Sequence, residues 1–352
     1  MAFLVTFLAL GFVIFVHELG HYLVARYVGV RVFEFSIGFG PKCFGKKLGN
    51  THYFLRLFPV GGYVRLAGMD DTETVSYPKE ESYLNKSPKA RMAIILAGSC
   101  VNILSGFIFF LLFAFCFGVP KLLPVVSMVV EGSAAQQAGL QMGDRLVEFN
   151  GVPIKDVRGD FIQPISHSAG KSCQVTYMRD SLVSTVDIVP RLMEPGQEAR
   201  IGVVLSSKRS SLQLKSSLVY AVKQVTFYTT LVFKSLNMLI SGKAAIKDLA
   251  GPVGIVQMAA FQFDQGLLVF LHFMAIISIS LGVVNLFPIP ALDGGHFMFL
   301  LVEQMTGKPI PQRIYQTISG VAMAILLLLM VFILFNDFLS WGQRASFFRS
   351  LL

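Results

Sequence analysis

The sequence predicts an α-helical multi-span membrane protein with four transmembrane helices, a β-hairpin that dips into the membrane, and one extracytoplasmic α+β domain. Its 352 residues are 54% hydrophobic and only 14% charged, which is too apolar for a water-soluble protein. Four segments are apolar over the roughly 20 residues that a helix needs to cross a bilayer. Between the second and the third of them, the composition becomes that of a globular domain.

The distribution of basic residues predicts the orientation of the four spans. Between Arg26 and Arg91 there are 11 Lys and Arg against 6 Asp and Glu, and no charged residue precedes the first span. By the positive-inside rule this loop is cytoplasmic and the N-terminus lies outside. The first span lacks the basic start and the small-residue cleavage site of a signal peptide, so we expect it to be retained. The four spans are Ala2–Val24, Met92–Val119, Leu267–Phe287 and Ile318–Phe338.

We expect four regions along the chain. Residues 1–119 hold the first two spans with a metal-binding motif and the hairpin, 120–207 form the globular domain, and 267–352 hold the last two spans. The remaining region, 208–266, is extracytoplasmic and contains an amphipathic stretch, Ser210–Gly242, with lysines among leucines and aromatic residues. A fifth span would put Lys234 at its centre and break the parity of the topology. We therefore predict a helix that lies along the outer membrane surface.

The first span contains the motif on which the functional prediction depends, His17-Glu18-Leu19-Gly20-His21. Two histidines four residues apart lie one above the other on a helix, so both imidazoles can bind one metal ion. Zinc suits this pair, and the carboxylate of Glu18 can take a proton from a metal-bound water. An acid inside a span is costly and therefore usually functional. The alternative is a pair of helix-packing histidines, with Glu18 bonded to a neighbouring span.

The first loop has the pattern of β-strands. Residues Phe33–Phe44 and His52–Leu66 alternate apolar and polar side chains and are interrupted by Gly and Pro. They are too apolar for a loop in water, so we predict a hairpin that dips into the membrane beside the metal site. Its exposed edge could pair with an extended substrate segment. The alternative is a loop that lies flat on the lipid headgroups.

The globular region resembles one PDZ domain of the bacterial type. The resemblance is carried by Gly132–Ala135, by Ala138–Asp144, by the tight turn Asn150-Gly151 and by the strand-like runs Gln174–Met178 and Val183–Val189. It implies a groove that accepts a peptide as an added strand and holds its carboxylate on backbone N–H groups. The alternative is a domain that has lost the groove and acts only by its bulk.

Zinc in a catalytic site keeps three protein ligands and one open position, so one further ligand is needed. Asp293 meets the topological requirement, because it follows the third span at its cytoplasmic end. Pro288 and Pro290 interrupt the helix just before it and free backbone groups near the site. The alternative is that Asp293 only caps the next helix.

Together these features resemble the site-2 protease family of intramembrane zinc metalloproteases, and within it the bacterial RseP type. The shared elements are HExxH in a first span, the PDZ insertion and the stretch N-x-x-P-x-P-x-L-D-G that begins at Asn285. Further matches are Gly61–Val64, Ala97-Gly98 with Asn102, and Gly251–Ile255. Many members have two tandem PDZ domains, whereas this chain has room for one.

The resemblance implies a zinc ion held by His17, His21 and Asp293, with Glu18 as the base and later the proton donor to the leaving amine. It implies that Asn285 handles substrate, as would Gly61 and Gly62 at the hairpin edge. For Asn285 and Asn102 the alternative is ordinary hydrogen bonding between helices. His296 is a further candidate as a fourth ligand or as a partner of a ligand.

The implied activity is hydrolysis of peptide bonds within the transmembrane segments of single-span proteins, such as anti-sigma factors or remnant signal peptides. The implied location is the bacterial inner membrane, with the metal site toward the cytoplasm and the PDZ domain outside. A catalytically inactive scaffold that binds peptides through its PDZ domain is the main rival, and a metal or proton transporter is another. The net charge of +9 suits a lipid surface, and its scattered distribution argues against nucleic acid.

Overall fold

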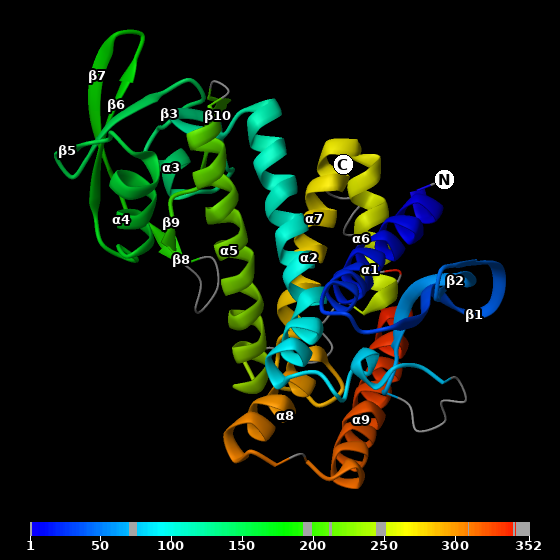
Figure 1. Ribbon diagram of the computed structural model, residues 1–352. Coiled ribbons are helices and arrows are strands. Elements are labelled where there is room, and N and C mark those ends of the chain that lie inside the picture. The colour runs from blue at the N-terminus through cyan, green and yellow to red at the C-terminus, as the bar shows by residue number, and fades with distance from the viewer. Residues whose placement is uncertain are drawn as a thin grey trace. The chain divides into compact units, whose positions relative to one another are not determined.

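The computed structural model describes residues 2–69, 76–192, 199–210, 213–243, 251–308, 310–340 and 342 (Figure 1). The chain divides into two compact units. The first unit comprises Met1–Leu112 and Leu218–Leu352, and the second comprises Phe113–Ser217. The second unit is therefore one continuous insertion into the first.

All four predicted spans are helices, and each is long and apolar enough to cross a membrane. They are α1 (Ala2–Tyr27), α2 (Pro88–Phe117), α7 (Leu267–Asn285) and α9 (Gln312–Leu339). Shorter helices accompany them: a 3-10 turn at Lys79–Glu81, α6 (Pro252–Asp264) and α8 (Asp293–Thr306). The chain thus has the helical content expected of a multi-pass membrane protein.

Helix α5 (Leu214–Ile240) differs from the expected surface helix. Its apolar face packs on α2 and α7, where Ala221 joins Phe110 and Ile279 in a buried cluster. Further along, the Tyr228 ring stacks on Phe110 at 5.8 Å, and the Phe233 ring meets Phe287 at 5.2 Å between centroids. Because α2 and α7 are long and apolar enough to be spans, this packing favours a helix beside them over one along the membrane surface, and the placement of α5 in the membrane stays a prediction. One side of α5 therefore contacts α2 and α7, while Val222, Phe227 and Leu231 remain exposed.

The predicted hairpin is present as two long antiparallel strands, β1 (Val32–Leu48) and β2 (Thr51–Leu66). Both strands fold back, so Glu34 of β1 lies opposite His52 at one end of β2 and opposite Arg65 at the other. The second half of β1 also pairs with the first half of β2, as in the Lys46–Tyr53 pair. The two outer edges of this folded hairpin are consequently residues 62–66 and residues 42–48. Its insertion into the membrane stays a prediction.

The second unit is an α+β domain built on antiparallel strands in the order β10-β3-β4-β6-β7, with β5 added to β4. Its core contains Phe149, Phe161 and Val175, all buried. Asn150 and Gly151 both adopt positive φ, 49° and 77°, as the predicted tight turn requires. The strands are β3 (Pro120–Val129), β4 (Arg145–Phe149), β5 (Val152–Pro153), β6 (Cys173–Arg179), β7 (Leu182–Ile188), β8 (Arg191–Leu192), β9 (Ala199–Arg200) and β10 (Val203–Arg209). The helical segments are α3 (Ala134–Gln137), a π-helical turn (Val157–Ile162) and α4 (Gln163–Ser166).

Candidate metal centre

Two of the predicted ligands lie on the face of α1 that passes against α2. His17 and His21 are one helical turn apart, and their Nε2 atoms are 3.2 Å from each other. Gly20 between them lets the two backbones touch, since a Cβ there would lie 2.6 Å from the carbonyl oxygen of Ala97 in α2. This close contact brings the polar groups of α2 within reach of both imidazoles.

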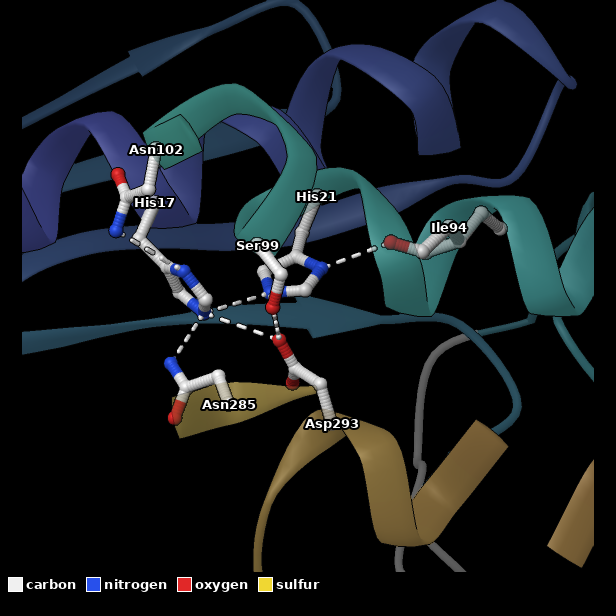
Figure 2. A network of polar contacts seen from close by, with 7 residues as sticks. All are labelled: His17, His21, Ile94, Ser99, Asn102, Asn285 and Asp293. Carbon is white, nitrogen blue, oxygen red and sulfur yellow. Dashed lines mark hydrogen bonds and ion pairs between the residues drawn. The ribbon is translucent and has the colours of Figure 1, made fainter. Parts of the chain in front are cut away.

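The third predicted ligand comes from the other end of the chain, as Figure 2 shows. The Oδ2 atom of Asp293, the first residue of α8, lies 3.2 Å from His17 Nε2 and 3.5 Å from His21 Nε2. The Ser99 hydroxyl of α2 donates to the same oxygen at 3.2 Å. Burial raises the pKa of the Asp293 carboxyl, but the two imidazoles outweigh it and hold that pKa well below its usual value. The lowered pKa favours the ionised carboxylate, which is the form that binds a metal ion.

The three ligand atoms have the spacing that one tetrahedral zinc ion requires. Zinc bonds of about 2.0–2.2 Å place neighbouring ligand atoms roughly 3.3–3.5 Å apart. The three separations here are 3.2, 3.2 and 3.5 Å. Within the described part of the chain, His17, His21 and Asp293 form the group of potential metal ligands, and the donor set of two imidazoles and one carboxylate is a known catalytic zinc set.

The far side of each imidazole also has a partner. The Nδ1–H of His21 donates to the carbonyl oxygen of Ile94 at 2.8 Å, which leaves the lone pair of Nε2 free for a metal. His17 Nδ1 lies 3.5 Å from the side-chain amide of the buried Asn102 (Figure 2). These contacts turn both Nε2 atoms toward Asp293.

The predicted base lines a cavity beside the ligands. Glu18 shares this cavity of about 590 Å³ with His21 and Asp293, and with Val64 and Leu66 from the outer edge of β2. The arrangement puts a carboxylate, two ligands and a strand edge around one space. A peptide lying along that edge would pass the carboxylate and the metal position.

Of the two glycines predicted to bind substrate, Gly62 lies against the base. A Cβ on Gly62 would be 3.0 Å from Glu18 Cγ and 2.7 Å from the Ser36 carbonyl oxygen, so the strand can approach the base only without a side chain here. Gly61 has φ +100°, and a Cβ there would collide with the Phe39 ring at 2.0 Å. Glycine is thus required at position 61 by its backbone conformation, and at position 62 by the close approach of the strand to Glu18.

The two remaining predicted residues are placed differently. Asn285, the last residue of α7, has its Nδ2 atom 3.4 Å from His17 Nε2, so its amide lies beside the metal position (Figure 2). His296 lines the cavity but is not in the ligand group, and its Nδ1 pairs instead with the Tyr315 hydroxyl at 2.6 Å. The fourth-ligand alternative for His296 has no support in this geometry.

Sequence reasoning missed two partners of the site. Ser99 was not identified, and the carbonyl group of Ile94 carries no signal in its side chain. The neighbouring pair Ala97-Gly98 was the available clue, because small residues mark the face on which one helix approaches another. The contact between Asn102 and His17 favours a role at the site over ordinary bonding between helices.

Comparison with known proteins gives one family across most of the chain. The model of the family described as peptidase family M50 matches residues 5–329. A provisionally named zinc metalloprotease of Campylobacter jejuni is 34% identical over 347 residues, covering 95% of this chain and 92% of that protein. The zinc metalloprotease RasP of Bacillus licheniformis is 28% identical, covering 96% and 98% of the two chains. The regulator of sigma-W protease RasP of Bacillus subtilis is 27% identical, covering 96% and 97%.

Part of the chain is also similar to a solved structure. That structure is the PDZ domain of the SdrC-like protein of Listeria monocytogenes, which is 22% identical to this chain. The match covers 24% of this chain and 86% of that one, with a TM-score of 0.22.

Proposed function

The chain belongs to peptidase family M50 and is a multi-pass zinc metalloprotease of the site-2 type, and we propose that it cleaves peptide bonds inside the membrane. The proposed substrates are single-span membrane proteins, cut within their transmembrane segments. Anti-sigma factors and remnant signal peptides are the two substrate classes that suit this activity.

One observation supports this proposal most strongly. The ligand atoms of His17, His21 and Asp293 are 3.2–3.5 Å apart, and two of these ligands belong to α1, a helix that can cross a membrane. A metal centre on such a helix would lie within the membrane, where the transmembrane segments of the proposed substrates also lie.

The chemistry follows from the residues around the metal position. Zinc, when bound, polarises the scissile carbonyl and lowers the pKa of a water molecule to about 7. Glu18 accepts the proton of the attacking water and delivers it to the leaving amine. The Asn285 amide donates a hydrogen bond to the carbonyl oxygen that gains negative charge, which stabilises the transition state.

The folded hairpin would present the substrate. A transmembrane helix hides its carbonyl groups, so it must unwind locally before it can be cut. Residues 62–66 form an outer edge of the hairpin, and Val64 and Leu66 line the cavity that holds Glu18. An extended segment that pairs with this edge has its backbone groups satisfied inside the membrane and lies beside the base.

The proposed location is the bacterial inner membrane, with the metal centre toward the cytoplasm and the inserted domain outside. The excess of basic residues between α1 and α2 supports this orientation. We assign the inserted domain a PDZ-type role, in which a peptide segment binds as an added strand and only substrates already trimmed on the outside are admitted.

The test of this function is cleavage of a single-span substrate in membranes. Glu18→Gln removes the base but keeps the ligands, so it should abolish cleavage while leaving bound zinc at the wild-type amount. Glu131→Gln, an exposed acid of the inserted domain, is the matched control and should cleave normally. Mass spectrometry of the products should place the cut within the apolar segment. Full activity of Glu18→Gln, or a cut only outside that segment, would contradict the proposal.

A further inference from the structure

A second cavity lies on the other side of α1 from the metal ligands and is almost wholly apolar. It has a volume of about 400 Å³ and lies between α1 and the folded hairpin. Phe15, Leu19 and Tyr22 of α1 form one wall, and the opposite wall consists of hairpin residues that include Phe44. None of its lining residues lines the cavity at the metal centre.

The rim of this cavity is basic. Lys46 is its one charged lining residue, and Lys42 and Lys47 lie on the same outer strand, all three exposed. No ion pair joins these lysines to a carboxylate among the described residues, and Lys42 instead lies 4.0 Å above the Phe54 ring. Glu34, the acid of β1, forms an ion pair with Arg65, and Lys42 also acts on its carboxylate electrostatically. Positive charge beside the cavity is therefore available to an anion.

The surface around the cavity is suited to lipid instead of water. Phe44 is 73% exposed and Leu55 is 47% exposed, although both are large and apolar. The wall formed by α1 is a helix long and apolar enough to cross a membrane, so acyl chains are the medium that we expect at this cavity. Basic side chains next to such an apolar surface occur where a protein meets anionic headgroups.

We propose that this cavity is a binding site for one anionic phospholipid. An acyl chain fills the space between α1 and the hairpin, and the phosphate group is bound by Lys46 at the edge of the cavity. The site couples the hairpin, whose opposite edge adjoins Glu18, to the composition of the membrane. It uses none of the metal ligands and does not depend on the proposed cleavage reaction.

Native mass spectrometry of the full chain, purified with a mixture of anionic and zwitterionic phospholipids, tests this site. The wild type should retain an anionic phospholipid several-fold more than a zwitterionic one. Lys42→Gln, Lys46→Gln and Lys47→Gln together should abolish that preference. The matched control makes the same charge change on exposed lysines of the inserted domain, Lys121, Lys155 and Lys171, and should keep it.

Leu55→Trp tests the position of the acyl chain, because it fills the cavity and leaves the lysines in place. It should lower retention of both lipids. Equal retention of the two lipids by the wild type, or an unchanged preference in the triple lysine variant, would overturn the proposal. Unchanged retention by Leu55→Trp would also overturn it, as would displacement of the lipid by a single-span substrate peptide.

An independent observation concerns Asn102 and rests on the proposed zinc site. Asn102 is fully buried in α2, and its Oδ1 has no hydrogen-bond partner among the described residues. Its Nδ2 lies 3.5 Å from His17 Nδ1. Its backbone carbonyl accepts hydrogen bonds from the hydroxyls of Ser105 and Ser278, at 2.8 and 3.0 Å, which holds the residue in place.

A half-turn of the side-chain amide exchanges its oxygen and its nitrogen, so hydrogen-bond chemistry decides which of the two atoms faces His17. An N–H₂ group facing His17 Nδ1 would force the ring proton onto Nε2, the atom that faces Asp293. With Oδ1 there instead, the orphaned oxygen accepts Nδ1–H, and the Nε2 lone pair is free for the metal. His21 already has this arrangement through the Ile94 carbonyl. The geometry points to Asn102 as a positioning residue that holds His17 in its ligand tautomer.

Competition with a chelator for zinc tests this role directly. Asn102→Leu should lower zinc affinity about 10- to 100-fold, the usual effect of losing the partner of a ligating histidine. Asn102→Asp keeps a carbonyl-type acceptor and should restore most of the affinity. Leu104→Ala, at an exposed position on α2, is the control and should bind zinc like the wild type. Wild-type affinity in Asn102→Leu, or equal losses in the Leu and Asp variants, would overturn the role; a wild type without zinc affinity would instead contradict the proposed function.

Discussion

Gly98 sets how closely α2 can approach the two imidazoles. A Cβ at this position would lie 2.3 Å from His21 Nε2 and 2.8 Å from His17 Cε1, distances that real Cβ atoms do not reach. The colliding atoms belong to the metal-binding rings, which are held from behind by Ile94 and Asn102. The absence of a side chain is therefore a requirement of the metal centre.

Gly98→Ala should accordingly weaken zinc binding by about 10-fold or more and reduce cleavage by a similar factor, because the rings must leave their ligand positions. Gly320→Ala is the matched control, since a Cβ on this helical glycine of α9 meets nothing within 4 Å. The control should bind zinc normally and gain stability of roughly 0.5–1 kcal/mol from its helix propensity. Chelator competition and thermal unfolding measure the two effects. Normal zinc affinity in Gly98→Ala would show that the rings can give way.

At this scale the sequence predicted the three side chains that the structure brings together as potential metal ligands, but not the contacts that orient them. The spacing of His17 and His21, and the place of Asp293 after a span, follow from helix periodicity and topology. Ser99 and Asn102 depend on which face of α2 meets α1, and an apolar helix has no polar stripe to indicate that face. The carbonyl group of Ile94 is available to any residue type, so no side chain predicts its use.

Among the individual elements, β6 of the inserted domain is held by a buried acid: Asp144, the residue before β4, pairs with Arg179 of β6. The Asp144 side chain is fully buried and accepts hydrogen bonds from Arg179 Nε at 2.7 Å and Nη2 at 2.8 Å. The backbone N–H of Gln141 donates to the same carboxylate at 2.8 Å. Burial raises the pKa of Asp144, but these donors outweigh it and hold the pKa below its usual value.

The stability of this domain should therefore depend on pH in the acid range. A carboxyl whose pKa is lower in the folded state stabilises the fold above its unfolded pKa, about 3.9 for Asp. That contribution is lost as the pH falls through the lower, folded value. The protection factors of the β6 amides, which are exchange rates corrected for the intrinsic rate at each pH, should fall below about pH 4 in the wild type. Asp144→Asn should be less stable at neutral pH and should lose most of this acid dependence. An unchanged acid profile in Asp144→Asn would assign the transition to other groups.

Two elements show that a sequence pattern predicts whether a segment is a helix or a strand better than it predicts what that segment packs against. The amphipathic stretch around Lys223 and Lys234 was correctly predicted as a helix, but amphipathicity does not tell whether helices or lipid cover the apolar face. The hairpin strands follow from their alternation, yet the pairing of Glu34 with both His52 and Arg65 does not, because a period of two identifies a strand without naming its neighbour.

For the whole molecule, the division into two units separates the metal centre from the inserted domain. Among the described residues, those that contact a ligand atom lie within Met1–Leu112 or Leu218–Leu352. The chain enters and leaves the inserted domain at one place. The backbone N–H of Ser210 donates to the Val119 carbonyl at 2.9 Å, and Arg209 pairs with Pro120 in the sheet. A domain with adjoining ends can be removed without stretching the rest of the chain.

Replacing residues 120–209 by a short glycine-serine linker should consequently leave zinc affinity at its wild-type value. If the inserted domain admits only trimmed substrates, the same deletion should raise cleavage of a single-span protein that keeps its outer domain, while cleavage of the trimmed form stays constant. The comparison uses both substrates with the wild type and the deletion variant in the same membranes, and chelator competition reports the zinc centre. Loss of zinc binding would show that the two units are not independent. Unaltered exclusion of the untrimmed substrate would move the selection of substrates from the inserted domain to the helices and the hairpin around the metal centre.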